Sequence, residues 1–317
     1  MKSYCLLLLV VSVLAFTGCK STSSQPTASI QETGVAFRAL HIESSEWNRT
    51  KATVALRKLL TKIKNDTSPS YDDRNPLTLL PVIHRSVRSA GYSIDSKKVR
   101  TFGDALGART LDCSDLTLLY LEVLDQLKIT AYPMFARNHV FIVLPTETGP
   151  LFYETTLGQT VTLESILERD NIATESVELK AYMVPEPATK ILSGVYLEMG
   201  LKMGRTRSQT EKAEEFFRKA IEIHPQLVSG YTSLAAHLCR QEKFSEAEPL
   251  LKEAMRLDPT SPELCDFASA LYESIGDTAR AIEMCEKAFV LGTENEETLN
   301  RFFRISVAEM LDVFSRQ

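Results

Sequence analysis

The sequence predicts an α+β domain followed by an all-α repeat solenoid. Residues 35–185 mix helical periodicity with short segments rich in β-branched and aromatic residues, whereas residues 186–317 repeat themselves at a fixed interval. A chain of 317 residues, 44% of them apolar, is long enough for about two domains that each bury a core. Its net charge of −5 gives no basic surface of the kind that binds nucleic acid, so no nucleic-acid partner is expected.

The N-terminal stretch MKSYCLLLLVVSVLAFTGC predicts a secretory signal and a lipid anchor. Lys2 precedes an apolar run that is too short and too close to the terminus for a membrane-spanning helix. The run ends in FTGC, which resembles a bacterial lipobox with Phe16 where Leu is usual. The resemblance implies a signal peptide over residues 1–18, cleavage before Cys19, and acyl chains such as palmitate on the Cys19 thiol. An ordinary secretory signal that is cut nearby is the alternative.

The predicted anchor also indicates a location. Residues 19–34 are rich in Ser and Thr and predict a flexible tether. Lys20 follows the cysteine, and in a Gram-negative cell a residue other than Asp at this place implies sorting to the outer membrane. We therefore expect a lipoprotein of the bacterial cell envelope that contacts the membrane through lipidated Cys19 and faces the periplasm.

The repeats of the last third are marked by small residues at a fixed spacing. Ala213, Ala247 and Ala281 open three similar segments and are equally spaced, with a period of about 34 residues. Small residues at these positions let two helices approach closely. Pro225 and Pro259 keep the same spacing and are expected to end the second helix of a pair.

This pattern resembles tetratricopeptide repeats over about residues 190–226, 228–261 and 262–295, with a capping helix over about residues 296–314. The resemblance implies a short right-handed solenoid that binds a protein or peptide partner. Cys285 falls at the position that Phe217 and Leu251 hold in the other repeats, which predicts a buried thiol rather than a ligand or disulfide.

The stretch LDCSDLTLLYLEVLDQLKI predicts a helix that begins close to Cys113. Asp112 is a good N-cap, Asp115 lies in the first turn, and a long apolar stripe follows. A cysteine at a helix N-terminus faces unpaired backbone N–H groups and the positive end of the helix dipole, which favour the thiolate. The two aspartates oppose this effect, so an activated Cys113 requires a basic partner.

Three segments after this helix predict an antiparallel meander. They are ITAYPMFA, VFIVL and LFYETT, which begin at Ile129, Val140 and Leu151 and are joined by short links. His139 stands at the start of the middle strand and Glu154 near the end of the third, so strand pairing can place them side by side. A thiol, an imidazole that takes its proton and a carboxylate that orients the imidazole are the groups that a cysteine nucleophile needs.

Cys113 on its apolar helix, followed along the chain by His139 and then Glu154 on their strands, resembles the site of the transglutaminase-like family. The resemblance covers about residues 104–167 and implies a cysteine-protease-like fold for residues 35–185. It implies Cys113 as nucleophile, His139 as general base and acid, and Glu154 as the orienting acid. Glu154 stands where the family usually has Asp, and no upstream Gln supplies a second oxyanion donor.

Two functions of different classes follow from these resemblances. The first is a membrane-anchored thiol acyl-transfer enzyme, a peptidase or amidase acting on envelope protein or peptide, with repeats for protein interaction. The second is a catalytically inactive lipoprotein adaptor whose repeats bind a protein partner. An open pocket and a short contact between Cys113 and His139 would favour the enzyme. Neither function implies a metal or an organic cofactor.

Overall fold

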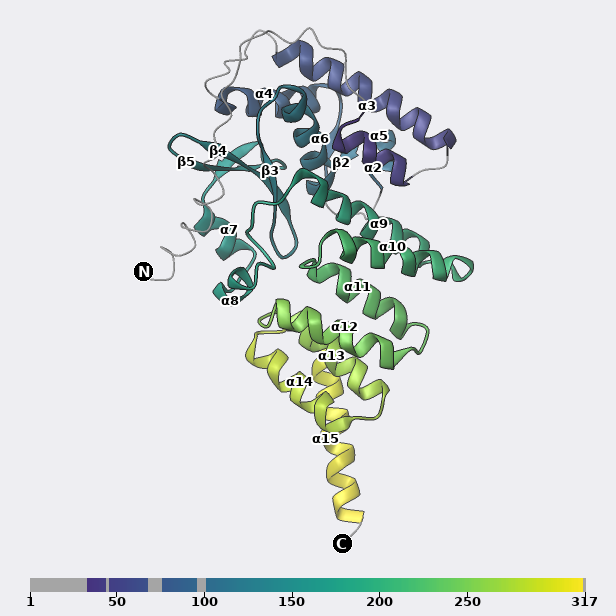
Figure 1. The fold of residues 1–317 in the computed structure, drawn as a ribbon. Coiled ribbons are helices and arrows are strands. Elements are labelled where there is room, and N and C mark those ends of the chain that lie inside the picture. Colours follow the sequence, from purple (N-terminus) through teal and green to yellow (C-terminus); the bar gives the residue numbers. More distant parts are fainter. Residues whose placement is uncertain (1–32, 44–45, 68–75, 96–100, 316–317) are drawn as a thin grey trace. The chain divides into compact units, whose positions relative to one another are not determined.

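The computed structural model describes residues 33–43, 46–67, 76–95 and 101–315 (Figure 1). The predicted signal peptide, Cys19 and most of the predicted tether lie outside the described residues. The chain forms two compact units, Met1–Val177 with Tyr182–His224 (unit 1) and Glu178–Ala181 with Pro225–Gln317 (unit 2). This division differs from the predicted boundary after residue 185, because the first repeat packs with unit 1.

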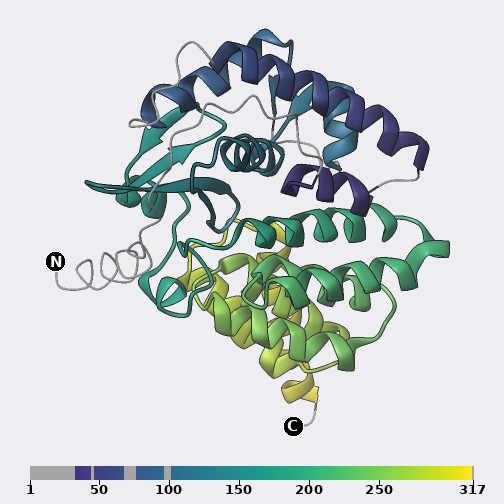
Figure 2. The same cartoon turned by 45° about the horizontal axis from the view of Figure 1, so that its top comes forward.

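The helices of unit 1 include a central helix that carries Cys113. In chain order they are α2 (Val35–Glu43), α3 (Glu46–Thr67), α4 (Pro76–Ser89), α5 (Phe102–Ala108), α6 (Cys113–Gln126), α7 (Leu163–Arg169), α8 (Thr174–Glu178), α9 (Leu192–Met203) and α10 (Thr210–Ile223). Figure 2 shows α3, coloured purple to blue, as the long helix along the outer edge of this layer. Gly91 follows the end of α4 with φ +85°, a left-handed conformation that glycine adopts readily.

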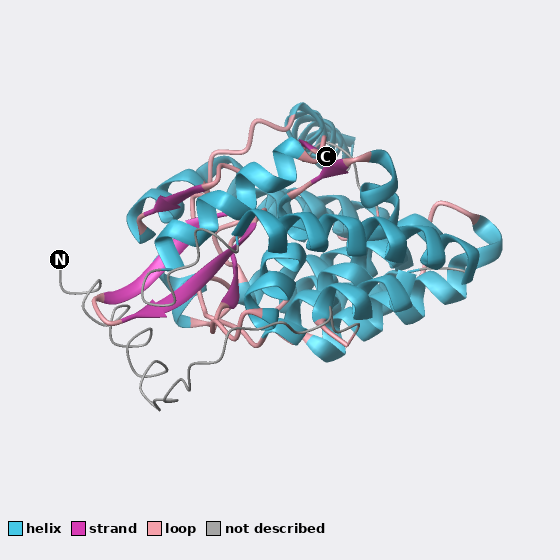
Figure 3. Ribbon diagram, turned by 90° about the horizontal axis from the view of Figure 1, so that it is seen from above, coloured by secondary structure: helices cyan, strands magenta, loops and turns pink. Residues whose placement is uncertain are grey.

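The strands of the described residues, magenta in Figure 3, all fall within the residue ranges of unit 1. Four of them form an antiparallel sheet in the order β3 (Tyr132–Phe135), β4 (Val140–Thr146), β5 (Gly149–Glu154) and β6 (Gln159–Val161). The first three are the predicted meander, and β6 was not predicted. A separate parallel pair joins β1 (Ser93–Ile94) to β2 (Thr110–Leu111).

Helix α6 lies at the centre of unit 1 because it is apolar on most of its circumference. Its start is fixed by a capping box in which Asp112 accepts the Asp115 N–H (2.9 Å) and Asp115 accepts the Asp112 N–H (3.0 Å). The Thr117 hydroxyl donates to the carbonyl of Val140 (3.4 Å), which ties α6 to the start of β4. The helix that carries the cysteine and the strand that follows the histidine are thus held together directly.

Two buried carboxylates join the helices around α6 by capping helix N-termini at long range. Glu122 of α6 accepts the N–H of Ala36 in the first turn of α2 (3.0 Å). Glu43, the last residue of α2, accepts the N–H groups of Phe102 and Gly103 at the start of α5 (both 2.7 Å). Each carboxylate satisfies backbone donors that have no partner within their own helix.

Unit 2 contains α11 (Val228–Cys239), α12 (Phe244–Leu257), α13 (Pro262–Ser274), α14 (Thr278–Val290) and α15 (Glu296–Ser315). With α9 and α10 of unit 1, these helices form the three predicted pairs and the predicted capping helix. In the first pair Gly200 of α9 faces Phe217 of α10, and a Cβ at residue 200 would lie 2.6 Å from that ring. Cys285 is a buried free thiol, as predicted, and so is Cys265. Within the described ranges, no helix combines the length and apolarity needed to cross a membrane.

Candidate functional site

The structure brings Cys113, His139 and Glu154 together from three separate elements of unit 1. Cys113 is the first residue of α6, His139 immediately precedes β4, and Glu154 ends β5. Strands β4 and β5 pair Ile142 with Tyr153. One residue further along the same antiparallel register, Glu154 lies opposite Phe141. Phe141 and His139 point to the same face because side chains alternate along a strand, so His139 and Glu154 are diagonal neighbours.

The contacts among these three residues form one chain. Nε2 of His139 lies 2.6 Å from Oε2 of Glu154, which is the distance of an ion pair although the ring N–H is not aligned as a hydrogen bond. The thiol of Cys113 adjoins the imidazole of His139 at the wall of one cavity and acts on its pKa. The imidazole is 16% exposed and the carboxylate 1% exposed, whereas the thiol of Cys113 is half-buried. The order thiol, imidazole, carboxylate is therefore present, with the thiol at the solvent side.

Glu154 has partners beyond His139. Its Oε1 accepts the backbone N–H of Thr156 (3.1 Å) and the Thr156 hydroxyl (2.8 Å). Its Oε2, which faces the imidazole, also accepts Nη1 of Arg169 (3.0 Å). Arg169 in turn donates to both carboxylate oxygens of Asp170 through Nε (2.7 Å) and Nη2 (3.1 Å). The carboxylate is thus fixed in position by Thr156 and Arg169 independently of the histidine.

The charged forms of His139 and Glu154 stabilise each other. Burial lowers the pKa of His139, but the polar contacts and charges of Cys113 and Glu154 outweigh burial and raise this pKa to about 9. Burial raises the pKa of Glu154, but His139, Thr156 and Arg169 outweigh it and lower this pKa to about 2. The imidazole therefore holds its proton at neutral pH and lies beside an ionised carboxylate.

A cavity of about 420 Å³ opens onto this group. Cys113 and His139 form part of its wall, so a ligand in the cavity can touch both the thiol and the imidazole. The other lining residues are mostly polar: Ile94, Asp95, Asn138, Thr156, Arg169 and Asp170.

Carboxyl groups also gather behind Cys113. Burial raises the pKa of Glu43 to about 7, although the N–H groups of Gly103 and Phe102 act in the opposite direction. Burial and neighbouring carboxylates raise the pKa of both Asp115 and Glu198 well above the usual range. Each of these shifts favours the protonated, uncharged form of a carboxyl group near the thiol. No group of three or more His, Cys, Asp and Glu side chains within the described part of the chain could hold a metal ion.

The sequence predicted the three central residues and missed the residues around them. Thr156 lies within the FYETTLG segment that predicted Glu154, and its hydroxyl could have been recognised as a partner for that acid. Arg169 and Asp170 come from the end of α7, where a neighbouring basic and acidic residue give no sequence signal of a site.

Comparisons with known proteins concern the repeats. No protein-family model matches the chain. A curated relative, the mouse (Mus musculus) interferon-induced protein with tetratricopeptide repeats 3, is 28% identical over 116 residues, which span 36% of this chain and 28% of that protein. The chain therefore matches less than a third of the length of this relative.

Solved structures of repeat proteins are also similar to the chain. The first tetratricopeptide domain of human RPAP3 is 21% identical and covers 40% of this chain and 98% of its own, with a TM-score of 0.37. A tetratricopeptide protein of Thermus thermophilus is 13% identical and covers 82% of this chain and 99% of its own, with a TM-score of 0.31. The chain carries helical repeats of the tetratricopeptide type, as its own regular period and helix pairs require. The transglutaminase-like resemblance of unit 1 stays a prediction.

Proposed function

We propose that unit 1 is a thiol acyl-transfer enzyme of the transglutaminase-like type, and that the repeats bind protein partners. The observation that supports this proposal is the contact chain from Cys113 through His139 to Glu154 at the wall of an open cavity. Three residues that lie far apart in the sequence meet in the order that acyl transfer requires. The substrate class is a carboxamide or peptide bond of an envelope protein or peptide.

The first half of the reaction forms a thioester. His139 carries the proton and Cys113 reacts as the thiolate, whose sulfur attacks the carbonyl carbon of the substrate. The C–N bond then breaks, and His139 gives its proton to the leaving amine. Glu154 stabilises the imidazolium before this transfer and keeps the ring in the required orientation. The backbone N–H of Cys113, at the N-terminus of α6, offers one hydrogen bond to the developing oxyanion.

The second half regenerates the thiol. Neutral His139 takes a proton from water, or from a second amine, as that nucleophile attacks the thioester carbon. The C–S bond breaks and the acid or the new amide leaves, so the thiolate and imidazolium are restored. Water as the acceptor gives hydrolysis, and an amine gives transfer. The residues that line the cavity are compatible with either acceptor.

A second candidate function is a lipoprotein adaptor in which unit 1 has no turnover. The sequence comparison favours it, because the similar curated protein is named for its tetratricopeptide repeats. In this reading the repeats bind a protein, and Cys113 is an unreactive thiol. The two candidates differ in one measurable property, the reactivity of Cys113.

The test is the rate of iodoacetamide alkylation of each cysteine between pH 5 and pH 9, resolved by peptide mapping. Cys239 is an internal control, because it is also half-buried and burial raises the pKa of its thiol. We expect labelling of Cys113 at pH 6 to be at least about tenfold faster than that of Cys239, because the Cys113 thiol lies beside the protonated imidazole of His139 at the N-terminus of α6, whereas burial raises the pKa of Cys239. In His139→Ala this difference should disappear.

The opposite result supports the adaptor. If Cys113 reacts only as pH approaches about 8.5, and His139→Ala reacts at the same rate as the wild type, the thiol enzyme is excluded. Partner binding by the repeats would then be the activity to pursue.

We also propose that Cys19 anchors the chain in the envelope, with unit 1 facing the periplasm. The lipobox-like sequence supports this proposal. Metabolic labelling with a palmitate analogue should mark the wild type and be absent from Cys19→Ser. Equal labelling of both would contradict the anchor.

A further inference from the structure

One arginine on the wall of the cavity already binds a carboxylate of its own chain. Arg169 donates to Asp170 through Nε (2.7 Å) and through Nη2 (3.1 Å), so one edge of the guanidinium holds both oxygens of the carboxylate. Both residues line the cavity together with Cys113 and His139. A carboxylate held by two N–H groups of one arginine is a common arrangement by which proteins recognise an anionic ligand. Here Asp170 takes the place of such a ligand.

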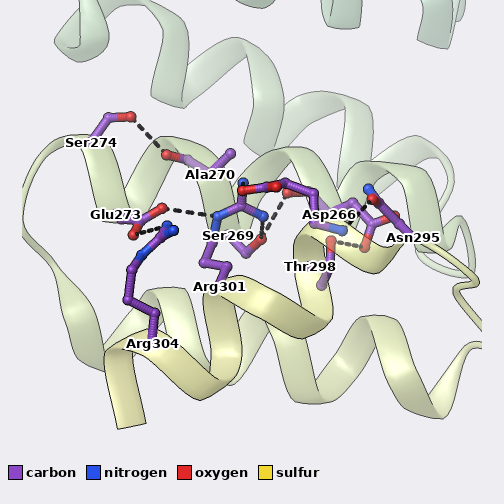
Figure 4. Close-up of polar contacts among 10 residues, drawn as sticks. Asp266, Ser269, Ala270, Glu273, Ser274, Asn295, Thr298, Arg301 and Arg304 are labelled. Atoms are coloured by element: carbon purple, nitrogen blue, oxygen red, sulfur yellow. Dashed lines mark hydrogen bonds and ion pairs between the residues drawn. The ribbon is translucent and has the colours of Figure 1, made fainter. Parts of the chain in front are cut away.

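A second arginine, in unit 2, shows what a structural pair looks like in this chain. Arg301 of α15 donates through Nε to Glu273 (3.0 Å) and through Nη1 to the Ser269 hydroxyl (3.1 Å), and Figure 4 shows both contacts. Its side chain is 9% exposed, and its partners on α13 fix one helix against another. The side chain of Arg169 is 40% exposed and borders the cavity beside the thiol. The Arg169 pair therefore faces space that a ligand can occupy.

The end of α7 holds Arg169 and Asp170 in this arrangement. Neighbouring residues within a regular helix point in different directions and do not pair. Helix α7 ends at Arg169, and the backbone leaves the helix at Asp170 (φ −95°, ψ 5°), whose N–H donates to the carbonyl of Ile166 (3.0 Å). The next residue, Asn171, lies in the left-handed region (φ +47°) and turns the chain away. The Asp170 side chain, 10% exposed, is thus held against the guanidinium by the local backbone.

The Arg169 guanidinium keeps two N–H groups that no contact among the described residues uses. Of the five N–H groups of an arginine, the Nε group and one on Nη2 donate to Asp170. One on Nη1 donates to Oε2 of Glu154 (3.0 Å). One N–H therefore remains on each terminal nitrogen. These groups can donate to an uncharged acceptor in the cavity, such as the oxygen of a peptide bond or of a carboxamide.

The charged groups around the thiol do not favour an anion in the cavity. His139 and Arg169 are cations on the wall, and Glu154 contacts both of them. The wall also carries the carboxylates of Asp95 and Asp170, so negative groups outnumber positive ones among these residues even before Cys113 ionises. A carboxylate that entered the cavity would approach a guanidinium that is already paired, and it would meet the like charge of Asp170.

We propose that Asp170 determines the substrate class: because it fills the carboxylate-binding edge of Arg169, the cavity accepts uncharged amide groups and rejects carboxylates. The acyl donor is then an internal peptide segment or a carboxamide side chain. A peptide whose terminal carboxylate or acidic side chain adjoins the reacting carbonyl is excluded by repulsion. This inference rests on the proposed thiol function, because it names the substrate class of the same site.

Two alkylating reagents of similar size and different charge measure this selectivity. The Cys113 thiolate displaces iodide from neutral iodoacetamide or from anionic iodoacetate, so a C–S bond forms and a C–I bond breaks in both reactions. The measured quantity is the ratio of the two second-order rate constants, iodoacetate over iodoacetamide, at about pH 7 in the full-length protein, resolved by peptide mapping. The thiolate fraction multiplies both constants and cancels in this ratio. In the wild type the ratio should be lower than that of 2-mercaptoethanol, a small uncharged thiol.

Asp170→Asn keeps the size of the side chain, removes its charge and frees at least one N–H of Arg169. We expect the ratio to rise at least about threefold, because the anionic reagent can then take the place of the Asp170 carboxylate. In an Arg169→Gln background the same change should raise the ratio less, because the guanidinium that would bind the reagent is gone. The matched control is Glu273→Gln, which removes the acidic partner of Arg301 and should leave the ratio at its wild-type value.

Three results would each overturn the inference. They are a wild-type ratio above that of 2-mercaptoethanol, a ratio that Asp170→Asn leaves unchanged, and a rise that is equally large with and without Arg169. Circular dichroism checks the fold of each variant, and Asp170→Ser replaces Asp170→Asn if the helix content of the latter differs from the wild type.

Failure of the proposed thiol function would look different. Cys113 would then react slowly with both reagents at neutral pH, whereas the ratio could still be measured at about pH 9, where ordinary thiols ionise. A slow Cys113 with a ratio that responds to Asp170→Asn would keep the charge selectivity of the cavity and exclude only the activated thiol.

Discussion

At the scale of single residues, one oxygen of Glu154 serves two cations. Oε2 lies 2.6 Å from the imidazole nitrogen of His139 and 3.0 Å from Nη1 of Arg169. The guanidinium therefore competes with the imidazolium for the same charge, while it also holds the carboxylate in place. Asp170 limits this competition, because it takes up part of the Arg169 charge through two hydrogen bonds.

Arg169→Gln should therefore raise the pKa of His139 above its value of about 9. Loss of the guanidinium removes a positive neighbour and leaves the charges of Glu154 and Asp170 to the imidazolium. The increase should be at most about one pH unit, since the Arg169 side chain is 40% exposed and partly screened. NMR titration of the histidine ring measures this pKa directly.

The matched control for this titration is Arg256→Gln, which removes an exposed arginine of unit 2 that pairs with Glu253. It should leave the His139 titration unchanged. A lower His139 pKa in Arg169→Gln would mean that the arginine acts mainly by positioning Glu154 and not through its charge.

The central residues of the candidate site were predictable because each adjoins a recognisable local signal. Cys113 follows an N-cap, and His139 and Glu154 border strands with clear β propensity. Arg169 was not predictable, because its role depends on how the turn after β5 approaches the end of α7. No local pattern encodes that approach.

At the scale of elements, the facing residues on the two helices of a repeat pair have complementary sizes. Gly200 faces Phe217 in the first pair, and Ser269 contacts Cys285 in the third. The corresponding residues of the second pair are Ala235 and Leu251, both buried. A large residue on the second helix is matched by a small one on the first, as a close-packed interface of fixed helix spacing requires.

Gly200→Ala should destabilise the fold by about 1–3 kcal/mol, because the new Cβ would overlap the Phe217 ring. Gly194→Ala in the same helix is the control. A Cβ there meets no atom within 4 Å, so this change should stabilise the helix by up to about 1 kcal/mol. Urea unfolding measures both variants.

The double variant Gly200→Ala with Phe217→Leu recreates the combination of the second pair. It should recover most of the stability that Gly200→Ala loses. If the double variant loses more unfolding free energy than the two single variants lose together, complementary residue size is not what couples the two positions.

The elements themselves were largely predictable, and their grouping was not. The limits of α6 and α15 and the order of the meander follow from caps, periodicity and strand propensity. The short β6 was missed because so short a strand carries too little pattern. The packing of α9 and α10 with unit 1 was missed because a repeat period defines a helix pair and not the neighbour that the pair contacts.

At the scale of the whole molecule, the shifted pKa values predict a maximum of stability in mild acid. The folded pKa of Glu43 is about 7, above its unfolded value of about 4.3, so the folded state gives up stability as pH rises between these values. The folded pKa of His139 is about 9, above about 6.5 when unfolded, so its contribution is complete below about 6.5 and is lost toward 9. Two groups act in the opposite direction. The contribution of Glu154 is lost as pH falls from about 4.3 to about 2. Burial and the charge of Lys190 lower the folded pKa of His224 to about 4, so its contribution is complete above about 6.5 and is lost as pH falls toward 4.

Thermal unfolding should therefore occur at the highest and nearly constant temperature between about pH 4.5 and about pH 6.5, where the Glu43 and His224 contributions oppose each other. It should occur several degrees lower at pH 9, since about 1 kcal/mol corresponds to roughly 2–4 °C for a domain of roughly 150–250 residues. Differential scanning calorimetry between pH 4 and pH 9 measures this profile. Glu43→Gln should make the midpoint rise between about pH 5 and about pH 6.5, because the His224 contribution is then unopposed, and His139→Gln should flatten the part above about pH 7. A midpoint that rises from pH 5 to pH 9 would contradict the assignment.

The long-range helix caps determine which part of unit 1 a pulling force on the chain would reach first. The first turn of α2 is held by Glu122 of α6, and a Cβ at Gly34 would overlap that carboxylate, so the chain enters unit 1 directly against it. A force that pulls the chain ahead of residue 33 would act first on the bond between Ala36 and Glu122. That bond ends on the same helix that begins with Cys113. A tension applied through the N-terminal segment would therefore act on α6, the helix that begins with Cys113, before it acts on the rest of the core.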